Sequence, residues 1–182
     1  MTETIRQAIE SYLERHWLLK LCQISQPPVP ERVITDLPHV QVTRLLRLPG
    51  AASGLTHWAK GMWEIAINAS ESPLRQRFSL AHDFKHVLDD PFITQLYGSP
   101  DSRRVHEWVE DVCDYFAACL LMPRAWVKAA YYRHGGQDVR QLAQRFAVSP
   151  KAMGMRLMSI VLVEPWTVRH GVYRREVTGV GA

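Results

Sequence analysis

Cysteine is scarce in this chain of 182 residues, and the cysteines present do not form a disulfide framework. The three residues, Cys22, Cys113 and Cys119, are odd in number and include no CxxC pair. Such a pattern favours a reducing compartment over a secreted, disulfide-rich class of protein. The N-terminal segment also lacks the charged, apolar and cleavage regions of a signal peptide. We therefore expect a cytoplasmic protein.

Long hydrophobic runs are missing as well. The longest apolar stretches, at residues 116–122 and 160–163, are far shorter than the roughly 20 residues that a helix needs to span a bilayer. Both are typical of a buried core, and we expect no membrane association. The chain has no internal repeat and no low-complexity tract. Its hydrophobic fraction of 47% and charged fraction of 22% are ordinary for one compact domain.

Positive charge is present but not concentrated. The formal net charge is +4 and the isoelectric point is about 9.1, values that would suit a nucleic-acid partner. However, the basic residues are spread along the chain, with local pairs at residues 103–104 and 174–175. A solvated basic surface is the better interpretation. DNA binding is therefore an alternative that we do not favour.

Hydrophobic periodicity and turn residues predict an α+β fold that is mostly helical. The expected helices span residues 3–22, 30–37, 74–88, 102–121, 124–134, 138–146 and 149–160, and the expected strands span residues 40–48 and 62–67. The strands would form a small sheet within residues 40–70, beside the helices at 74–88 and 102–121. The tail from residue 165 onward either forms a final strand or hangs loose.

Two histidines lie four residues apart in the helix expected at 74–88. His82 and His86 therefore share one face of that helix, about one turn apart. Two imidazole nitrogens placed in this way can occupy two corners of a zinc tetrahedron. A catalytic site then needs one more protein ligand and leaves a position for water. Taken alone, such a pair is more often found on a helix surface or in a cap, so the interpretation as a metal site depends on a third ligand.

The next helix supplies carboxylates at suitable spacings. Glu110 and Asp114 lie one turn apart on one face, and so do Glu107 and Asp111. A carboxylate that faces the histidine pair would complete a His₂Glu set of the catalytic zinc type. The other carboxylate on that face could orient an imidazole by accepting its free N–H.

These residues belong to two longer motifs. Residues 77–86 read RFSLAHDFKH, and residues 110–123 read EDVCDYFAACLLMP. The two motifs resemble the ImmA/IrrE family of zinc metallopeptidases, whose members carry a helix of the form RFtlAHElgH and then one of the form ExxAnxFAaxLLmP. Residues 61–68 resemble the family's strand before the histidine helix, and residues 138–158 resemble its segment after the active site. The resemblance covers roughly residues 27–160.

The resemblance implies a role for each matched residue. His82, His86 and Glu110 would be the metal ligands. Asp114 matches a position that would orient a ligand, whereas Glu107 falls outside the motif and is expected to be a solvated helix residue. Zinc is the cation that the family implies, although Mn²⁺ or Fe²⁺ also suits a set of two histidines and a carboxylate.

The resemblance also implies a substrate. Members of this family are bacterial or phage cytoplasmic proteins that cleave a DNA-binding repressor of the helix-turn-helix type, often encoded nearby. We therefore expect a zinc-dependent endopeptidase-like protein whose partner is a protein substrate, namely such a repressor.

Two residues depart from the family's pattern. The general base is usually the Glu directly after the first His, and here that position is Asp83. Aspartate has the same chemistry but is one methylene shorter, and a misplacement of about 1 Å can cost on the order of 100-fold in rate. Lys85 stands where the family usually has Gly, and it could pair with Asp89 four residues on. The site is therefore a slow peptidase, an active one in which the surroundings compensate, or a metal-binding pseudoenzyme.

The last two expected helices, at residues 138–146 and 149–160, have the sequence shape of a helix-turn-helix. A helix that reads DNA should expose polar or basic side chains, and this one would expose few beyond Lys151, Arg156 and Ser159. Its methionines are better explained by packing, so we favour a structural role for the segment. The rival hypothesis is a DNA-binding or regulatory module whose metal is structural.

We divide the chain into four parts on this basis. They are an N-terminal helix at residues 1–26, a metallopeptidase-like domain at 27–134, a helix-turn-helix-like segment packed on it at 135–163, and a C-terminal tail at 164–182. All candidate site residues fall in the second part.

Overall fold

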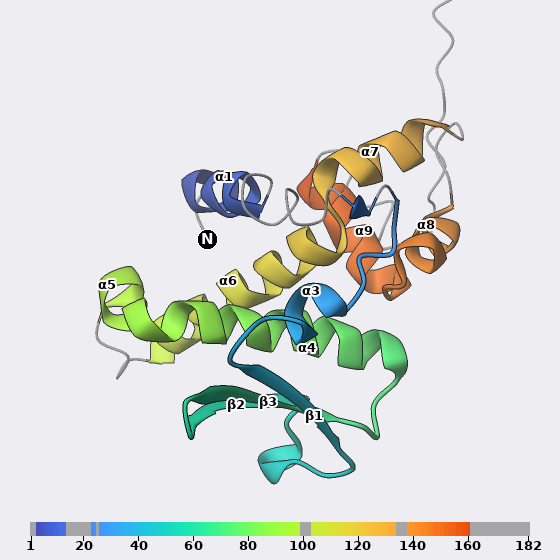
Figure 1. Ribbon diagram of the computed structural model, residues 1–182. Coiled ribbons are helices and arrows are strands. Elements are labelled where there is room, and N and C mark those ends of the chain that lie inside the picture. Colours follow the sequence, from blue (N-terminus) through green and yellow to red (C-terminus); the bar gives the residue numbers. More distant parts are fainter. Residues whose placement is uncertain (1–2, 14–22, 25, 99–102, 134–137, 161–182) are drawn as a thin grey trace, which may run out of the picture.

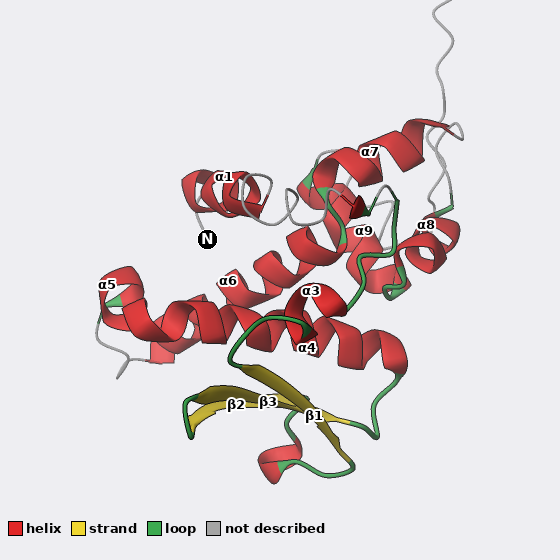
Figure 2. Ribbon diagram, in the orientation of Figure 1, coloured by secondary structure: helices red, strands yellow, loops and turns green. Residues whose placement is uncertain are grey.

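Helices dominate the fold, and one small sheet lies along a side of the molecule (Figure 1, Figure 2). A computed structural model describes residues 3–13, 23–24, 26–98, 103–133 and 138–160. The predicted α+β class is confirmed. No helix within these ranges is long and apolar enough to cross a bilayer. The elements are α1 (Glu3–Tyr12), α3 (Arg32–Thr35), β1 (Val40–Leu45), η3 (Pro49–Ala51), β2 (Gly54–Ala59), β3 (Met62–Asn68), α4 (Pro73–Asp89), η4 (Asp90–Phe92), α5 (Ile93–Tyr97), α6 (Arg103–Leu121), α7 (Arg124–Arg133), α8 (Val139–Phe146) and α9 (Pro150–Ser159).

The sheet has the strand order β1-β3-β2, with β1 parallel and β2 antiparallel to the central β3. Ile65 and Ile67 of β3 are fully buried in the core that α4 also enters. The turn between β2 and β3 places Lys60 at φ 51° and Gly61 at φ 78°. Two successive residues with positive φ are typical of a tight hairpin turn. The hairpin leaves β2 at the edge of the sheet, in contact with α4.

The sequence did not predict β2, although it predicted β1 and β3, the strands before and after it in the chain. This strand reads GLTHWA, and only a weak apolar alternation runs through it. Half of its residues are exposed, namely Leu55, His57 and Trp58. Pairing with β3 therefore makes it a strand, because its own side chains contribute little burial.

The helix α4 begins at Pro73, one residue before its predicted start. Ser72 caps it by accepting a hydrogen bond from the backbone N–H of Arg75 at 3.3 Å, and Pro73 occupies its first turn. The helix packs between the sheet and α6. Its buried apolar side chains are Leu80, Ala81, Phe84 and Val87. The half-buried His82 and His86 lie beside this stripe, at the boundary between core and solvent.

A buried ion pair joins α1 to α9. Glu10 in α1 accepts hydrogen bonds from Arg156 in α9 at 2.9 Å and from the Tyr115 hydroxyl in α6 at 3.0 Å. Arg156 also donates to the carbonyl of Met122 at 3.0 Å, and it is 2% exposed. Burial raises the pKa of Glu10, but the charge of Arg156 and the hydrogen bonds from Arg156, Tyr115 and Arg124 outweigh it, so the pKa lies below its ordinary value. The expectation that Arg156 is exposed on a DNA-reading helix is therefore wrong.

The helices α8 and α9 lie in the two stretches where helices were predicted, and a short turn joins them. Asp138 and Ser149 cap the two helices through their side chains, and Ala147 adopts a left-handed conformation between them at φ 52°. The elements η4 and α5 lie in a stretch for which no helix was predicted. The predicted continuation of the first helix over residues 14–22 and the predicted tail both lie outside the described residues.

Candidate metal centre

Side chains from α4 and α6 meet where the two helices pack together. The Nε2 atoms of His82 and His86 lie 3.2 Å apart. Glu110 places one carboxylate oxygen 3.2 Å from His82 Nε2 and the other 3.5 Å from His86 Nε2. With Zn–N and Zn–O bonds of ~2.0–2.1 Å, the ligand atoms of a tetrahedron are about 3.3–3.4 Å apart. The three predicted ligand side chains are thus brought together at distances that fit one metal ion.

The other ring nitrogen of His82 is held by a carboxylate. Nδ1–H of His82 donates to Oδ1 of Asp114 at 2.8 Å, so its Nε2 is directed to Glu110. Burial lowers the pKa of His82, but hydrogen bonds and charges from Asp114 and Glu110 outweigh it and raise the pKa to about 9. A metal ligand must be an unprotonated nitrogen, so a cation that binds here displaces a proton. Asp114 lies where the prediction placed the orienting carboxylate.

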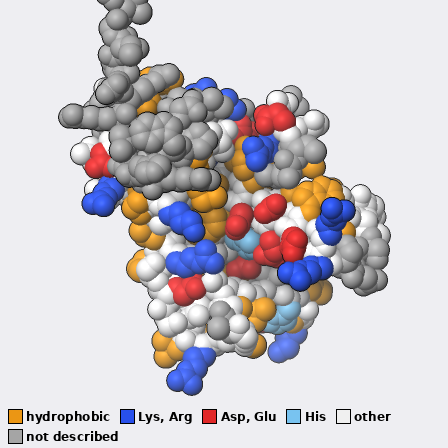
Figure 3. Space-filling model, turned by 180° about the vertical axis from the view of Figure 1, so that it is seen from behind, with side chains coloured by type: hydrophobic (Ala, Val, Ile, Leu, Met, Phe, Trp, Pro, Cys, Tyr) orange, Lys and Arg blue, Asp and Glu red, His pale blue; other side chains and the backbone are white. Residues whose placement is uncertain are grey.

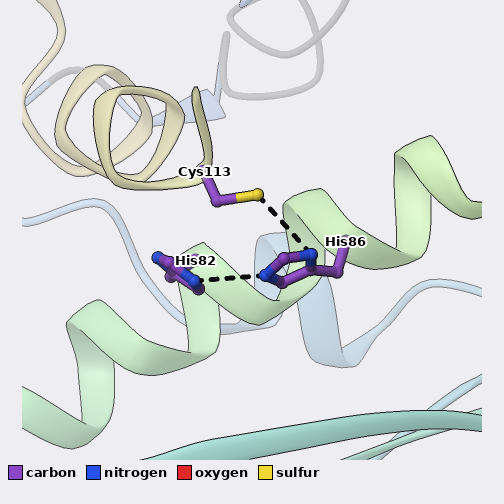
Figure 4. Close-up of side chains that lie close together, drawn as sticks. All are labelled: His82, His86 and Cys113. Carbon is purple, nitrogen blue, oxygen red and sulfur yellow. Dashed lines mark hydrogen bonds between the residues drawn. The ribbon is translucent and has the colours of Figure 1, made fainter. Parts of the chain in front are cut away.

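A cysteine that the sequence interpretation passed over also lies here. The sulfur of Cys113 is 3.7 Å from Nδ1 of His86, and potential ligand atoms of His82, His86 and Cys113 all lie within 4.8 Å of one another (Figure 4). The signal was present in the sequence, because Cys113 follows Glu110 by three residues and so shares its helix face. Burial raises the pKa of the Cys113 thiol far above its ordinary value. Glu110 and Cys113 are thus two candidates for the third ligand.

The candidate site opens into a cleft of about 380 Å³. Its walls come from α4, from α6 and from residues 52–54 at the start of β2. On the face turned away in Figure 1, acidic side chains gather around a histidine, with lysine and arginine side chains to both sides (Figure 3). The cleft is therefore open to solvent, and its metal end is rich in negative charge.

Asp83, the residue in the general-base position, lines the same cleft. It is 7% exposed, and its carboxylate lies so close to Gly54 that a Cβ atom at position 54 would overlap it. Burial raises the pKa of Asp83 to about 6, with the positive charge of His82 acting in the opposite direction. Because Gly54 in the edge strand β2 has no side chain, the Asp83 carboxylate can occupy this space.

Residues 40–158 match the family model of the IrrE N-terminal-like domain, peptidase M78. The chain belongs to this family. The membership predicted from the two motifs is confirmed, and the matched region contains every side chain of the candidate site.

The curated relatives of this IrrE-like chain include the radiation response metalloprotease IrrE of Deinococcus radiodurans, which is 31% identical over 102 residues. The protein of the same name from Deinococcus deserti is 37% identical over 90 residues. These matches cover 50% and 47% of this chain but 31% and 32% of the relatives, so the chain matches about a third of their length. Among solved structures, a Mycobacterium tuberculosis transcriptional regulator has a similar fold, with a TM-score of 0.58 and 19% identity over 86% of this chain and 46% of the regulator.

Two substitutions in the IrrE-like motifs are accommodated without blocking the cleft. Lys85, in place of the usual glycine, forms an ion pair with Asp89, as the sequence predicted. Asp89 also accepts a hydrogen bond from the hydroxyl of Tyr97, and the ammonium of Lys85 lies 5.7 Å from the ring centre of Phe116. Lys85 is thus held between α4, α5 and α6, outside the set of residues that line the cleft. Cys113, in place of the motif's alanine, is a further substitution besides Asp83 and Lys85, and it too is outside the set of residues that line the cleft.

Proposed function

We propose that this IrrE-like chain is a metallo-endopeptidase that holds one zinc ion through His82, His86 and Glu110. The observation that carries the proposal is the spacing of their ligand atoms, 3.2–3.5 Å, within an open cleft. Family membership supports a divalent metal, a hydrolytic role and a protein substrate. Three protein ligands leave a fourth position for water or substrate, as in catalytic zinc sites.

Glu110 is a better third ligand than Cys113 on two grounds. Glu110 faces Nε2 of both histidines, whereas Cys113 faces Nδ1 of His86. An imidazole that binds a metal through one ring nitrogen directs the other away from it. In addition, a hydrogen bond from His82 holds the pKa of Glu110 below its ordinary value, so this carboxylate is ionised before a metal binds, whereas the buried thiol of Cys113 would first have to lose its proton to the cation. Cys113 then accepts the Nδ1–H of His86, as Asp114 does for His82.

The protein side chains have distinct parts in the proposed reaction. A zinc ion, when bound, supplies a Lewis acid for the peptide carbonyl and for the attacking water. Asp83 takes a proton from that water and later donates it to the leaving amine. Asp114 keeps the ring of His82 turned so that Nε2 faces the metal position.

Whether the protein cleaves a bound peptide or only binds it depends on how well Asp83 serves as the general base. Its side chain is one methylene shorter than glutamate, and its carboxylate lies against Gly54 in the edge strand. A base misplaced by about 1 Å can lose on the order of 100-fold in rate, so we expect slow cleavage. The second candidate function is a metal-binding pseudoenzyme that uses the same cleft without turnover. The shorter reach of Asp83, which stands where the family has glutamate, favours this alternative.

We further propose that the substrate is a helix-turn-helix repressor in the cytoplasm, as the family resemblance implies. The relatives named radiation response metalloproteases and the similar structure named a transcriptional regulator support a role in regulation. The division at residues 1–26, 27–134, 135–163 and 164–182 stays our proposal for the domains. We do not propose DNA binding, because the burial of Arg156 removes a basic side chain from the surface of α9.

The test measures zinc content and cleavage on the same preparation. Wild type, Asp83→Glu and Glu110→Ala are compared, with Glu107→Ala as the control because Glu107 is an exposed carboxylate of the same helix. Candidate substrates are helix-turn-helix repressors and unfolded peptides. Stoichiometric zinc with slow wild-type cleavage, lost in Glu110→Ala and kept in Glu107→Ala, supports the proposal. Stoichiometric zinc with cleavage by Asp83→Glu alone identifies the pseudoenzyme, and wild type without bound metal refutes both.

A further inference from the structure

A positive charge lies in the cleft apart from the metal ligands. Arg75, in the first turn of α4, lines the same cleft as His82 and Asp83. Among the cleft-lining residues in the described ranges it is the only lysine or arginine. At the other end of the cleft, the carboxylates of Asp83, Glu110 and Asp114 surround the two histidines. The cleft is therefore basic at the start of α4 and acidic at the metal position.

The spacing of Arg75 and His82 along α4 gives the distance, along a bound peptide, between the arginine and the metal position. Arg75 and His82 are seven residues apart, so they share one helix face and are about 10 Å apart along the axis at ~1.5 Å per residue. Ser79 lies between them and also lines the cleft. An extended peptide advances about 3.3 Å per residue. A peptide that follows α4 therefore passes Arg75 about three residues from the bond held at the metal position.

Neighbouring side chains hold Arg75 in place at this part of the cleft. Nη2 of Arg75 donates to Oγ of Ser53 at 3.1 Å, and Nε lies 3.8 Å from the carboxylate of Glu71. Ser53 also donates to Glu71 at 2.7 Å, which braces the group. The Arg75 side chain is still 56% exposed. A guanidinium has five N–H donors in a planar fork, so a braced and exposed one can still bind a carboxylate through two parallel hydrogen bonds.

We propose that Arg75 selects substrates with an aspartate or glutamate side chain about three residues from the cleaved bond. The proposal rests on the proposed function, because the metal position defines which bond is cleaved. An acidic side chain closer to that bond meets Asp83, Glu110 and Asp114, which repel it. The cleft therefore selects the position of the acidic residue as well as its charge.

The test uses the zinc-loaded full chain and one peptide sequence in which Glu, Gln or Lys is moved through four positions on each side of the bond. Two readouts are taken: kcat/KM for cleavage, and Kd from the fluorescence anisotropy of labelled peptides. We expect a preference for Glu over Gln of about tenfold in both, confined to a position about three residues from the bond. This is the size of a partly exposed charge-assisted hydrogen bond.

Variants at position 75 separate recognition from general effects. Arg75→Gln should remove the preference by weakening the Glu peptide alone, and Arg75→Glu should transfer the preference to the Lys peptide. Arg103→Gln is the control, because Arg103 is an exposed arginine of α6 outside the cleft lining, and it should keep the wild-type preference. No positional preference in wild type, or equal weakening of the Glu and Gln peptides by Arg75→Gln, overturns the inference. A binding preference that inverts in Arg75→Glu without any cleavage supports Arg75 and refutes the peptidase instead.

Discussion

Replacing Glu10 with alanine should destabilise the fold strongly, because it leaves the guanidinium of Arg156 buried without its counter-charge. The two side chains are 13% and 1% exposed, respectively, and the ion pair between them is 2.9 Å long. Removal of one partner from a buried ion pair costs about 3–5 kcal/mol. For a chain of this size, each kcal/mol lowers Tm by about 2–4 °C, so the expected decrease is roughly 6–20 °C.

The assay is thermal and urea unfolding of wild type, Glu10→Ala and the double variant Glu10→Ala/Arg156→Met. Replacing a whole buried ion pair with apolar side chains is often nearly neutral, so the double variant should recover most of the loss. Glu3→Ala, at the exposed start of the same helix, is the matched control and should stay within about 0.5 kcal/mol of wild type. A loss of less than about 1 kcal/mol in Glu10→Ala, or a double variant less stable than the single one, would refute the reasoning.

The same ion pair predicts how stability depends on pH. The pKa of Glu10 in the folded protein lies below its ordinary value of 4.5. Its contribution is therefore fully present above pH 4.5 and is lost as the pH falls through the lower folded-state value. Glu10→Gln should flatten the stability profile in this acidic window, as measured by urea unfolding at a series of pH values. An unchanged profile would contradict the assignment.

Three further predictions concern the metal centre. Gly54→Ala should displace the carboxylate of Asp83 and lower cleavage on the order of 100-fold with unchanged zinc content; full activity would show that this packing is unimportant. Glu110→Ala should lose stoichiometric zinc, whereas Cys113→Ala should lower zinc affinity only about tenfold, as expected for a group that orients a ligand. The reverse order in a chelator competition assay would make Cys113 the third ligand. Because His82 is protonated below a pKa of about 9, zinc affinity should fall about tenfold per pH unit below that value, and a pH-independent affinity would exclude this proton displacement.

Local signals predicted the helices that carry the site. Ser72 and Pro73 mark the start of α4, and the helical repeat places His82 and His86 on one face. The edge strand β2 was missed because its own residues bury little and it depends on β3 for its hydrogen bonds. The short helix α5 was missed because it has too few residues for a recognisable period, and Tyr97 anchors it through a contact with Asp89.

The candidate site was predicted as far as helix spacing and motif allowed. Spacing alone left two carboxylate pairs on α6 equivalent, and the family motif selected Glu110. Arg156 was expected on the surface, because periodicity gives the face of a helix but not what packs against it. Its partner Glu10 lies 146 residues earlier, and no local pattern reports such a contact. Cys113 was overlooked because a lone cysteine on an apolar helix face is ordinarily a core residue.

The ion pair of Glu10 and Arg156 also has a consequence for synthesis of the chain on the ribosome. Synthesis runs from the N-terminus, so α1 emerges first and α9 is the last described helix to appear. The side chains from His82 to Asp114 are all available before Arg156 is made. A nascent chain therefore has its complete set of candidate metal ligands while Glu10 still lacks its buried partner Arg156 and can pair only with the more exposed Arg124. A product that stops short of Arg156 would keep those ligands and lose the buried one of the two arginines that pair with Glu10 of α1.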